Sequence, residues 1–205
     1  MGGIKKEKYL LEPESYTALV SSLRPCVVQV SGGEPLLRPE VADIVKAIKK
    51  HNNGLVHLIL VTNGSLLNKE NYAELKEAGV DRFSVSLDFP NEKHNDFQRH
   101  PGLYAHLEET IPRLAAESGY DDIALNSAIT QLNLPYLIDL ANKVEEWGLY
   151  ISYSAYSLLN TGDKSFFIYS KEDLEMLQRQ ILYRDTVYHF SISDCDNSTY
   201  NQDYP

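Results

Sequence analysis

Apolar positions along this chain switch repeatedly between a helical period and a strand period. The stripe from Tyr16 to Leu23 recurs at helical spacing, whereas the run from Leu55 to Val61 is apolar at nearly every position, as in a strand buried on both faces. The predicted helices cover about residues 13–23, 39–54, 68–79, 103–118, 137–148 and 170–183. The predicted strands cover residues 26–31, 55–61, 82–87, 123–129 and 149–155. This short, even alternation predicts a parallel sheet with right-handed crossovers, either a barrel or a doubly wound sheet.

Four of the predicted strands alternate polar with apolar side chains, so each has one polar face. The polar sets are Gln29 and Ser31, then Ser84, Ser86 and Asp88, then Asn126 and Thr130, then Ser152 and Ser154. Since neighbours on a strand face opposite ways, the apolar set faces the helices and the polar set faces an interior. A closed eight-stranded barrel fills that interior with Val, Ile and Leu instead. The pattern therefore favours an open or partial barrel whose interior holds a polar ligand.

Three segments show no apolar period. Residues 89–102 are polar, residues 156–169 form a loop rich in aromatic residues, and residues 184–205 are polar and rich in tyrosine. We therefore divide the chain into one domain at residues 1–183 and, at residues 184–205, a polar tail or the start of a further region.

Composition and charge narrow the classes of function. The chain has 205 residues, of which 43% are hydrophobic, which suits one sizeable domain. No apolar run reaches the roughly 20 residues of a membrane span, and the N-terminal sequence lacks the apolar core of a secretory signal. We therefore expect a cytoplasmic protein that does not contact a membrane. Its net charge of -10 disfavours nucleic acid as the main partner, because phosphate binding needs basic patches.

Cysteine and histidine spacing indicates no metal site. The chain has two cysteines, Cys26 in a predicted strand and Cys195 near the end, and their spacing fits neither a disulfide framework nor a metal cluster. His94, His100 and His106 have no metal-ligand spacing with either cysteine, so we interpret them as loop or surface residues. We predict no metal ligand in this sequence.

The strongest candidate for ligand binding is Gly32-Gly33-Glu34-Pro35, which follows the first predicted strand. Paired glycines let a ligand approach the main chain without a Cβ in the way. Glu34 has no cation beside it in the sequence, so its carboxylate can hold a ligand ammonium. The alternative is a strand-to-helix turn with an incidental glutamate.

The same four residues resemble the GGEP motif of radical S-adenosylmethionine (SAM) enzymes. Thr62-Asn63-Gly64 likewise resembles the TNG that commonly follows the next strand in that family. The resemblance covers about residues 13–183. It implies an α/β fold, namely a partial (β/α)6 TIM-like barrel of the radical SAM type, here lacking its first strand.

The resemblance also implies roles for individual residues. Glu34 is expected near the methionine ammonium of SAM, Arg99 on its carboxylate, and Asn126 near the ribose or the substrate. Ser86 and Asp88 are expected near the ribose. The ten residues placed near the cofactor are Gly32, Gly33, Glu34, Pro35, Thr62, Asn63, Ser86, Asp88, Arg99 and Asn126. The structural alternatives are caps for Ser86 and Asp88, a surface ion pair of Arg99 with Asp96 or Glu92, and a satisfied buried hydrogen bond for Asn126.

Activity in the family that the chain resembles depends on SAM, a [4Fe-4S] cluster and an electron donor. The reduced cluster cleaves SAM to methionine and a 5′-deoxyadenosyl radical, which takes a hydrogen atom from the substrate. The family holds its cluster with Cys-x-x-x-Cys-x-x-Cys after the first strand, and this sequence has no such motif. We therefore interpret the chain as a truncated radical SAM core, inactive as given, whose substrate the sequence does not identify.

Two other interpretations stay open. One is a non-catalytic fragment or pseudoenzyme that retains the barrel. The other is an unrelated α/β-barrel enzyme that uses Glu34 and Asp88 as acid and base. Turnover without iron or SAM would support the last of these.

Overall fold

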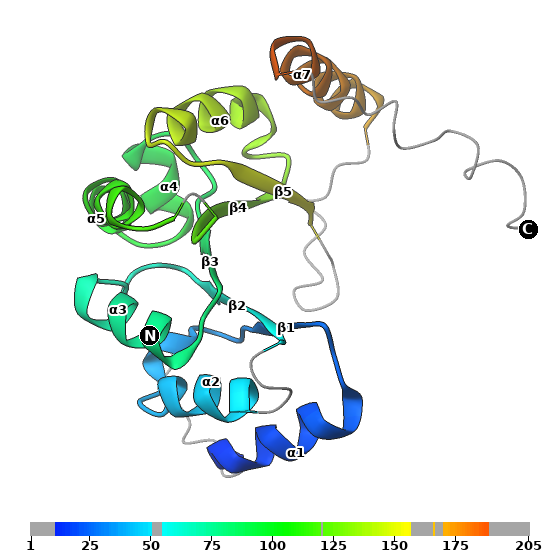
Figure 1. Ribbon diagram of the computed structural model, residues 1–205. Coiled ribbons are helices and arrows are strands. Elements are labelled where there is room, and N and C mark those ends of the chain that lie inside the picture. Colours follow the sequence, from blue (N-terminus) through cyan, green and yellow to red (C-terminus); the bar gives the residue numbers. More distant parts are fainter. Residues whose placement is uncertain (1–10, 51–54, 120, 157–165, 167–169, 189–205) are drawn as a thin grey trace, which may run out of the picture.

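Five parallel strands form the centre of the protein, a computed structural model of which describes residues 11–50, 55–119, 121–156, 166 and 170–188. The strands are β1 (Val27–Val30), β2 (His57–Thr62), β3 (Arg82–Ser86), β4 (Ile123–Ile129) and β5 (Ile151–Ala155). Each strand pairs with the next one in the chain, in the order β1-β2-β3-β4-β5. A doubly wound sheet reverses its strand order at a switch point, and this sheet does not. The sheet is therefore a curved section of a barrel wall (Figure 1).

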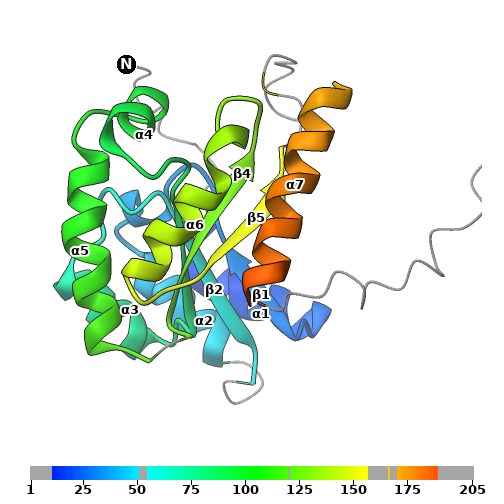
Figure 2. The ribbon, with the colours of Figure 1, turned by 90° about the horizontal axis from the view of Figure 1, so that it is seen from above.

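The helices that connect the strands lie on one side of this wall. In chain order the helices of the described residues are α1 (Pro13–Leu23), α2 (Val41–Lys50), α3 (Lys69–Ala78), α4 (Glu92–Gln98), α5 (Leu103–Glu117), α6 (Leu137–Glu146) and α7 (Lys171–Tyr188), with 3-10 turns η1 (Pro35–Leu37) and η3 (Leu134–Tyr136). Of these, α1 precedes β1 and α7 follows β5. Figures 1 and 2 show α2, α3, α5 and α6 along the convex side of the sheet, and α7 beyond β5. Within the described part of the chain, no helix combines the length and the apolar character needed to cross a membrane.

Local sequence sets the ends of α3. Asn68 caps the helix by accepting a hydrogen bond from Asn71 N, and the Asn71 side chain accepts one from Asn68 N in return. Gly79 follows the last turn with φ of +116°, a left-handed conformation that glycine adopts without strain. The sequence predicts both ends correctly because both signals are local.

The convex face of the sheet carries the core. Leu58, Leu60, Phe83, Val85 and Leu125 are 0% exposed and alternate along their strands with residues of the opposite face. Burying one such side chain stabilises the fold by roughly 1.5 to 3 kcal/mol. This apolar layer therefore decides which side of the wall the helices cover.

The concave face carries polar side chains on β1, β3, β4 and β5, as the alternation predicts, while β2 presents Ile59 and Val61 there. The parallel register places Ser86 opposite Asn126 and Asn126 opposite Ser152, so one polar row crosses β3, β4 and β5. Gln29 on β1 and Ser154 on β5 are exposed on the same face. The partial barrel thus has a helix-covered apolar side and a polar interior side.

Asp88 does not share the polar face, and that part of the prediction is wrong. β3 ends at Ser86, and the Asp88 carboxylate accepts a hydrogen bond from Ser127 Oγ at 3.3 Å. Ser127 alternates with Asn126 along β4 and is 0% exposed, so it lies on the face that the helices cover. Strict alternation holds only within a strand, and Asp88 lies beyond its end.

Two helices differ from their predicted extent. α4 lies within residues 89–102, where the sequence predicts no helix, and Asn91 caps it by accepting a hydrogen bond from His94 N. Its large apolar residue, Phe97, is 88% exposed, so α4 lacks the apolar stripe that reveals a helix in a sequence. α7 continues to Tyr188, so the proposed boundary at 183/184 falls inside a helix. Residues 189–205, and nearly all of the loop at 157–169, lie outside the described residues.

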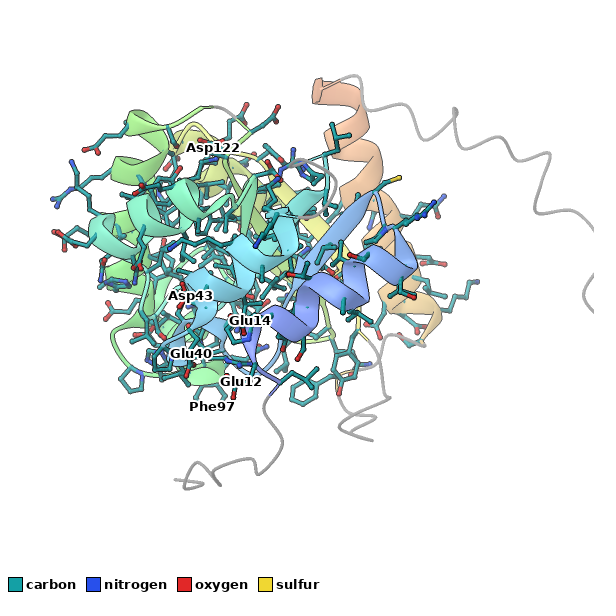
Figure 3. All side chains as sticks on the ribbon, turned by 60° about the horizontal axis from the view of Figure 1, so that its bottom comes forward. Glu12, Glu14, Glu40, Asp43, Phe97 and Asp122 are labelled. Atoms are coloured by element: carbon teal, nitrogen blue, oxygen red, sulfur yellow. The ribbon has the colours of Figure 1, made fainter. Side chains whose placement is uncertain are left out.

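The two ends of the barrel wall differ. Figure 3 shows Asp122, which precedes β4, at one end and Phe97, on the helix after β3, at the other. Ion pairs gather where the strands begin, such as Lys76 Nζ to Asp122 Oδ1 at 2.9 Å and Lys49 Nζ to Asp81 Oδ2 at 2.7 Å. The predicted ligand residues lie where the strands finish, the end at which parallel barrels generally bind ligands.

Candidate functional site

Glu34 joins the ends of the first two strands. Its Oε1 accepts hydrogen bonds from Leu36 N at 3.1 Å and from Thr62 Oγ1 at 2.7 Å. Its Oε2 accepts a third bond, from Asn63 N at 2.7 Å. The glutamate of the first motif is thus bonded to the threonine and asparagine of the second. We call the residues Gly32, Gly33, Glu34, Pro35, Thr62 and Asn63 the Glu34 cluster.

The Glu34 carboxylate can still bind a cation. All three of its donors are neutral, and the described part of the chain offers it no ion pair. An ionised carboxylate has about four lone-pair positions, of which these bonds occupy three. An acceptor position on Oε2 and the negative charge remain for a ligand such as an ammonium group.

The two glycines before Glu34 leave open space beside the main chain. A Cβ built on Gly32 or Gly33 has no heavy atom within 4 Å, and both residues are exposed. Pro35 then starts η1 with a preset φ. A ligand can therefore lie against the backbone of both glycines, next to the carboxylate.

The turn after β2 has a fixed shape. Gly64 N donates to Thr62 Oγ1 at 3.0 Å, and Gly64 has φ of +78°. A Cβ at this position would lie 2.5 Å from Cδ2 of Leu107, so only glycine fits. Because α5 packs directly on the turn, Thr62 and Asn63 reach Glu34 from a well-defined position.

Ser86 and Asn126 lie side by side on the concave face. They are register partners in β3 and β4, and Asn126 Nδ2 donates to Ser152 Oγ at 3.0 Å. Both are half-buried. Their hydroxyl and amide groups can bind the hydroxyl groups of a ligand lying along this face.

Asp88 and Arg99 form a pair at the end of β3. Arg99 donates to Asp88 Oδ2 from Nε at 2.9 Å and from Nη2 at 2.7 Å. The Asp88 side chain is 3% exposed and that of Arg99 is 27% exposed. Arg99 therefore does not pair with Asp96, which instead accepts hydrogen bonds from Gly102 N and Tyr104 N at the start of α5. Nη1 of Arg99 has no protein partner among the described residues and can bind an anionic group.

A buried polar network behind this pair was not predicted. Asn133 is 0% exposed, and its Nδ2 donates to Ser127 Oγ at 3.0 Å, which in turn donates to Asp88. Asn133 Oδ1 accepts a bond from Thr130 N at 2.8 Å. The network links the ends of β3 and β4. The Thr-x-x-Asn spacing signals a turn, but nothing in the sequence says which strand the turn would touch.

Comparison with known proteins identifies the family. The profile of the Radical SAM superfamily matches residues 3–134 of the chain. This chain belongs to the radical SAM superfamily. The matched range contains the Glu34 cluster, the Ser86–Asn126 pair and the Asp88–Arg99 pair.

The curated relatives are named for different reactions. The chain is similar to an "AdoMet-dependent heme synthase" of Methanosarcina barkeri, at 31% identity over 153 residues that cover 74% of this chain and 42% of the relative. It is also similar to a "GTP 3′,8-cyclase" of Aquifex aeolicus, at 31% identity over 185 residues that cover 86% of this chain and 57% of the relative. The chain thus spans about half the length of these relatives.

Solved structures confirm the partial barrel. Streptococcus suis SuiB bound to S-adenosylmethionine has a TM-score of 0.65 at 19% identity, over 89% of this chain and 43% of SuiB. Coproporphyrinogen III oxidase (HemN) from Escherichia coli has a TM-score of 0.63 at 13% identity, over 85% of this chain and 44% of HemN. Identities this low show a shared fold and no more.

Radical SAM proteins use SAM and a [4Fe-4S] cluster, and the residues of this chain fit the first but not the second. The open backbone at Gly32 and Gly33, next to a carboxylate with an acceptor position to spare, fits the amino-acid end of SAM. The cluster needs three thiolates, whereas the sequence has two cysteines, of which Cys26 is exposed before β1. The described residues also contain no group of three or more side chains suited to a metal ion.

Proposed function

We propose that this chain is the SAM-binding part of a radical SAM enzyme that abstracts a hydrogen atom from its substrate. The observation that carries the proposal is the Glu34 cluster, which aligns a carboxylate beside two open glycines. In this proposal Oε2 of Glu34 accepts a hydrogen bond from the α-ammonium of SAM. A charge-assisted bond of this kind contributes roughly 1.5 to 3 kcal/mol to binding.

The remaining predicted residues orient the rest of SAM in this proposal. Ser86 and Asn126 bind the ribose from the concave face, and Nη1 of Arg99, which has no partner among the described residues, binds the carboxylate. The Asp88 carboxylate is already bonded to Arg99 and Ser127, so we assign it to holding Arg99 rather than to a ribose hydroxyl. Each of these residues binds or positions SAM, and none of them transfers a proton.

A bound [4Fe-4S] cluster would supply the electron-transfer chemistry of this family, and we assign no ligand of that iron–sulfur cluster to this chain. In our proposal the three thiolates come from residues outside this sequence, because Cys26 and Cys195 cannot form the set. An external electron donor, a cytoplasmic location, and the absence of nucleic-acid and membrane partners remain part of the proposal.

The substrate is proposed only by chemical character. Beyond Ser86 and Asn126, which we assign to the ribose, the concave face offers the hydroxyl groups of Ser152 and Ser154. These groups bind a polar substrate through neutral hydrogen bonds. The heme synthase and the GTP cyclase named above act on different molecules, so the relatives do not narrow the choice.

The acid–base alternative gains no support from the geometry. It needs the Asp88 carboxylate to exchange a proton with a substrate, whereas that side chain is 3% exposed and already accepts hydrogen bonds from Arg99 and Ser127. Glu34 is bonded to three donors at the ends of β1 and β2.

A direct titration tests the proposed function. We expect SAM to bind the purified 205-residue chain with one-to-one stoichiometry in calorimetry, and adenosine, which lacks the amino acid, to bind at least about tenfold more weakly. No binding at about 1 mM SAM by a chain that circular dichroism shows to be folded would contradict the proposal.

A further inference from the structure

His106 has an environment that the sequence does not foresee. The sequence predicts a loop or surface residue, whereas His106 lies half-buried in α5. Its Nε2 lies 3.1 Å from Gly64 O and 3.1 Å from Leu67 O. Carbonyl oxygens only accept hydrogen bonds, so Nε2 carries a proton and donates to both. Its Nδ1 lies 3.5 Å from Thr110 Oγ1, one turn further along the helix.

The two carbonyls belong to the turn that holds Glu34. Leu67 N donates to Gly64 O at 3.1 Å, which closes the turn on itself. At its other end the turn presents Thr62 Oγ1 and Asn63 N to the Glu34 carboxylate. His106 Nε2 on α5 therefore holds one end of the turn, and the other end of the turn is bonded to Glu34.

The packing around Gly64 shows why this donor matters. α5 contacts the turn through two neighbouring residues, His106 by hydrogen bonds and Leu107 by close packing against Gly64. Leu107 fixes how near the helix lies, but an apolar contact is not directional. The hydrogen bonds from His106 fix the orientation of the Gly64 carbonyl, and with it the direction in which Thr62 and Asn63 point.

We infer that His106 is a positioning residue for SAM binding, acting through the turn from Thr62 to Leu67 on the Glu34 carboxylate. The inference rests on the proposed function, because it assigns Glu34 to the SAM ammonium. His106 itself does not touch the ligand. Its effect on affinity therefore depends entirely on Glu34.

Two substitutions separate the donor from the bulk of the side chain. His106→Gln keeps a donor near the place of Nε2, whereas His106→Leu keeps volume and helix propensity without a donor. We expect SAM affinity to fall about fivefold in His106→Leu and to stay within about twofold in His106→Gln. Ile111→Val, which trims a fully buried residue on the same helix, is the control for lost stability and should leave affinity unchanged.

A double variant tests the route through Glu34. Once Glu34→Gln has removed the charge, adding His106→Leu should change SAM affinity by less than about twofold. If His106→Leu weakens binding as much in the Glu34→Gln background as alone, or if His106→Gln fails to restore the affinity, the inference is wrong.

Amide hydrogen exchange distinguishes failure of this inference from failure of the proposed function. By NMR, His106→Leu should speed exchange of the Asn63, Gly64 and Leu67 amides several-fold, and His106→Gln should not. This readout needs no ligand. If the parent chain binds no SAM but these amides respond as expected, the hydrogen bonds from His106 do hold the turn and the proposed function fails. If the amides do not respond, the inference about His106 is overturned.

Discussion

Thr62 Oγ1 lies 2.7 Å from Glu34 Oε1, although the two residues are 28 positions apart in the sequence. The bond connects two motifs that the sequence shows only as separate strand ends. It makes the orientation of the Glu34 carboxylate depend on the turn after β2. A ligand group that binds Glu34 therefore binds a carboxylate whose direction is set by two strands.

The Thr62 hydroxyl is the first test of this arrangement. Thr62→Val keeps the shape of the side chain but removes the donor, whereas Thr62→Ser keeps the donor. We expect Thr62→Val to lose about 1 kcal/mol of unfolding free energy in urea and to bind SAM about fivefold more weakly, because the carboxylate loses an orienting bond. Thr62→Ser should bind SAM like the parent. Equal affinities of the two variants would show that the bond has no part in binding.

The glycines offer a contrast between stability and binding. A Cβ at Gly64 would lie 2.5 Å from Leu107 at a φ of +78°, so Gly64→Ala should destabilise the fold by about 2 kcal/mol or more. A Cβ at Gly33 meets nothing within 4 Å, so Gly33→Ala should leave the thermal midpoint within about 2 °C of the parent.

The same Gly33→Ala substitution should nevertheless weaken SAM binding about tenfold, because its methyl group occupies the space proposed for the ligand. Calorimetry and thermal unfolding on both variants give the comparison. An unchanged affinity in Gly33→Ala would mean that the ligand does not approach this part of the backbone.

The contact proposed between Arg99 and SAM makes the affinity depend on the carboxylate of the ligand. Arg99→Gln should weaken binding of SAM about tenfold but leave binding of decarboxylated SAM within about twofold, because only SAM has the group that Arg99 is proposed to meet. Asp88→Asn should show the same selectivity more weakly, since it removes the charge that holds Arg99. If both ligands lose affinity equally in Arg99→Gln, Arg99 has a structural role.

Two aspartates at the other end of the barrel make stability depend on pH. Burial alone would raise the pKa of the Asp81 carboxyl, but hydrogen bonds from Lys49 Nζ and Leu58 N outweigh burial and lower the pKa from its ordinary value of 3.8. Burial would also raise the pKa of the Asp122 carboxyl. Hydrogen bonds, first among them the bond from Lys76 Nζ, outweigh burial and lower that pKa. A carboxyl whose pKa is lower in the folded chain stabilises the fold at any pH above its pKa in the unfolded chain. This contribution is lost as the pH falls through the pKa of the folded chain.

We therefore expect the urea-derived free energy of unfolding to fall between about pH 5 and pH 2, and to fall less steeply in Asp81→Asn. The variant lacks one of the carboxylates whose protonation drives the change. An equal slope in the parent and in Asp81→Asn would show that Asp81 does not contribute.

Periodicity predicts most of this fold but not its local exceptions. β4 has the predicted bounds, Ile123–Ile129, because a buried strand flanked by turn residues is visible within its own sequence. α4 is missed because a seven-residue helix whose large apolar side chain faces solvent has no apolar stripe. Local patterns thus reveal elements that bury a face, and they fail for elements that do not.

The site residues likewise divide into those that the local sequence reveals and those that it does not. Glu34 could be selected from its own neighbours, because two glycines and a strand end precede it. The pairing of Asp88 with Arg99, and the donation from His106 to the turn at Gly64, depend on which elements become neighbours in space. One sequence does not contain that information.

The most direct test of the central claim is the affinity of Glu34→Gln for two ligands. SAM carries the ammonium that Glu34 is proposed to bind, and 5′-methylthioadenosine has the same nucleoside without the amino acid. Glu74→Gln, an exposed residue on α3 with the same change of charge, is the matched control. We predict that Glu34→Gln binds SAM at least about tenfold more weakly, while its affinity for 5′-methylthioadenosine and both affinities of Glu74→Gln stay within about twofold of the parent. A folded Glu34→Gln chain that binds SAM as tightly as the parent would contradict the assignment of Glu34 to the ammonium.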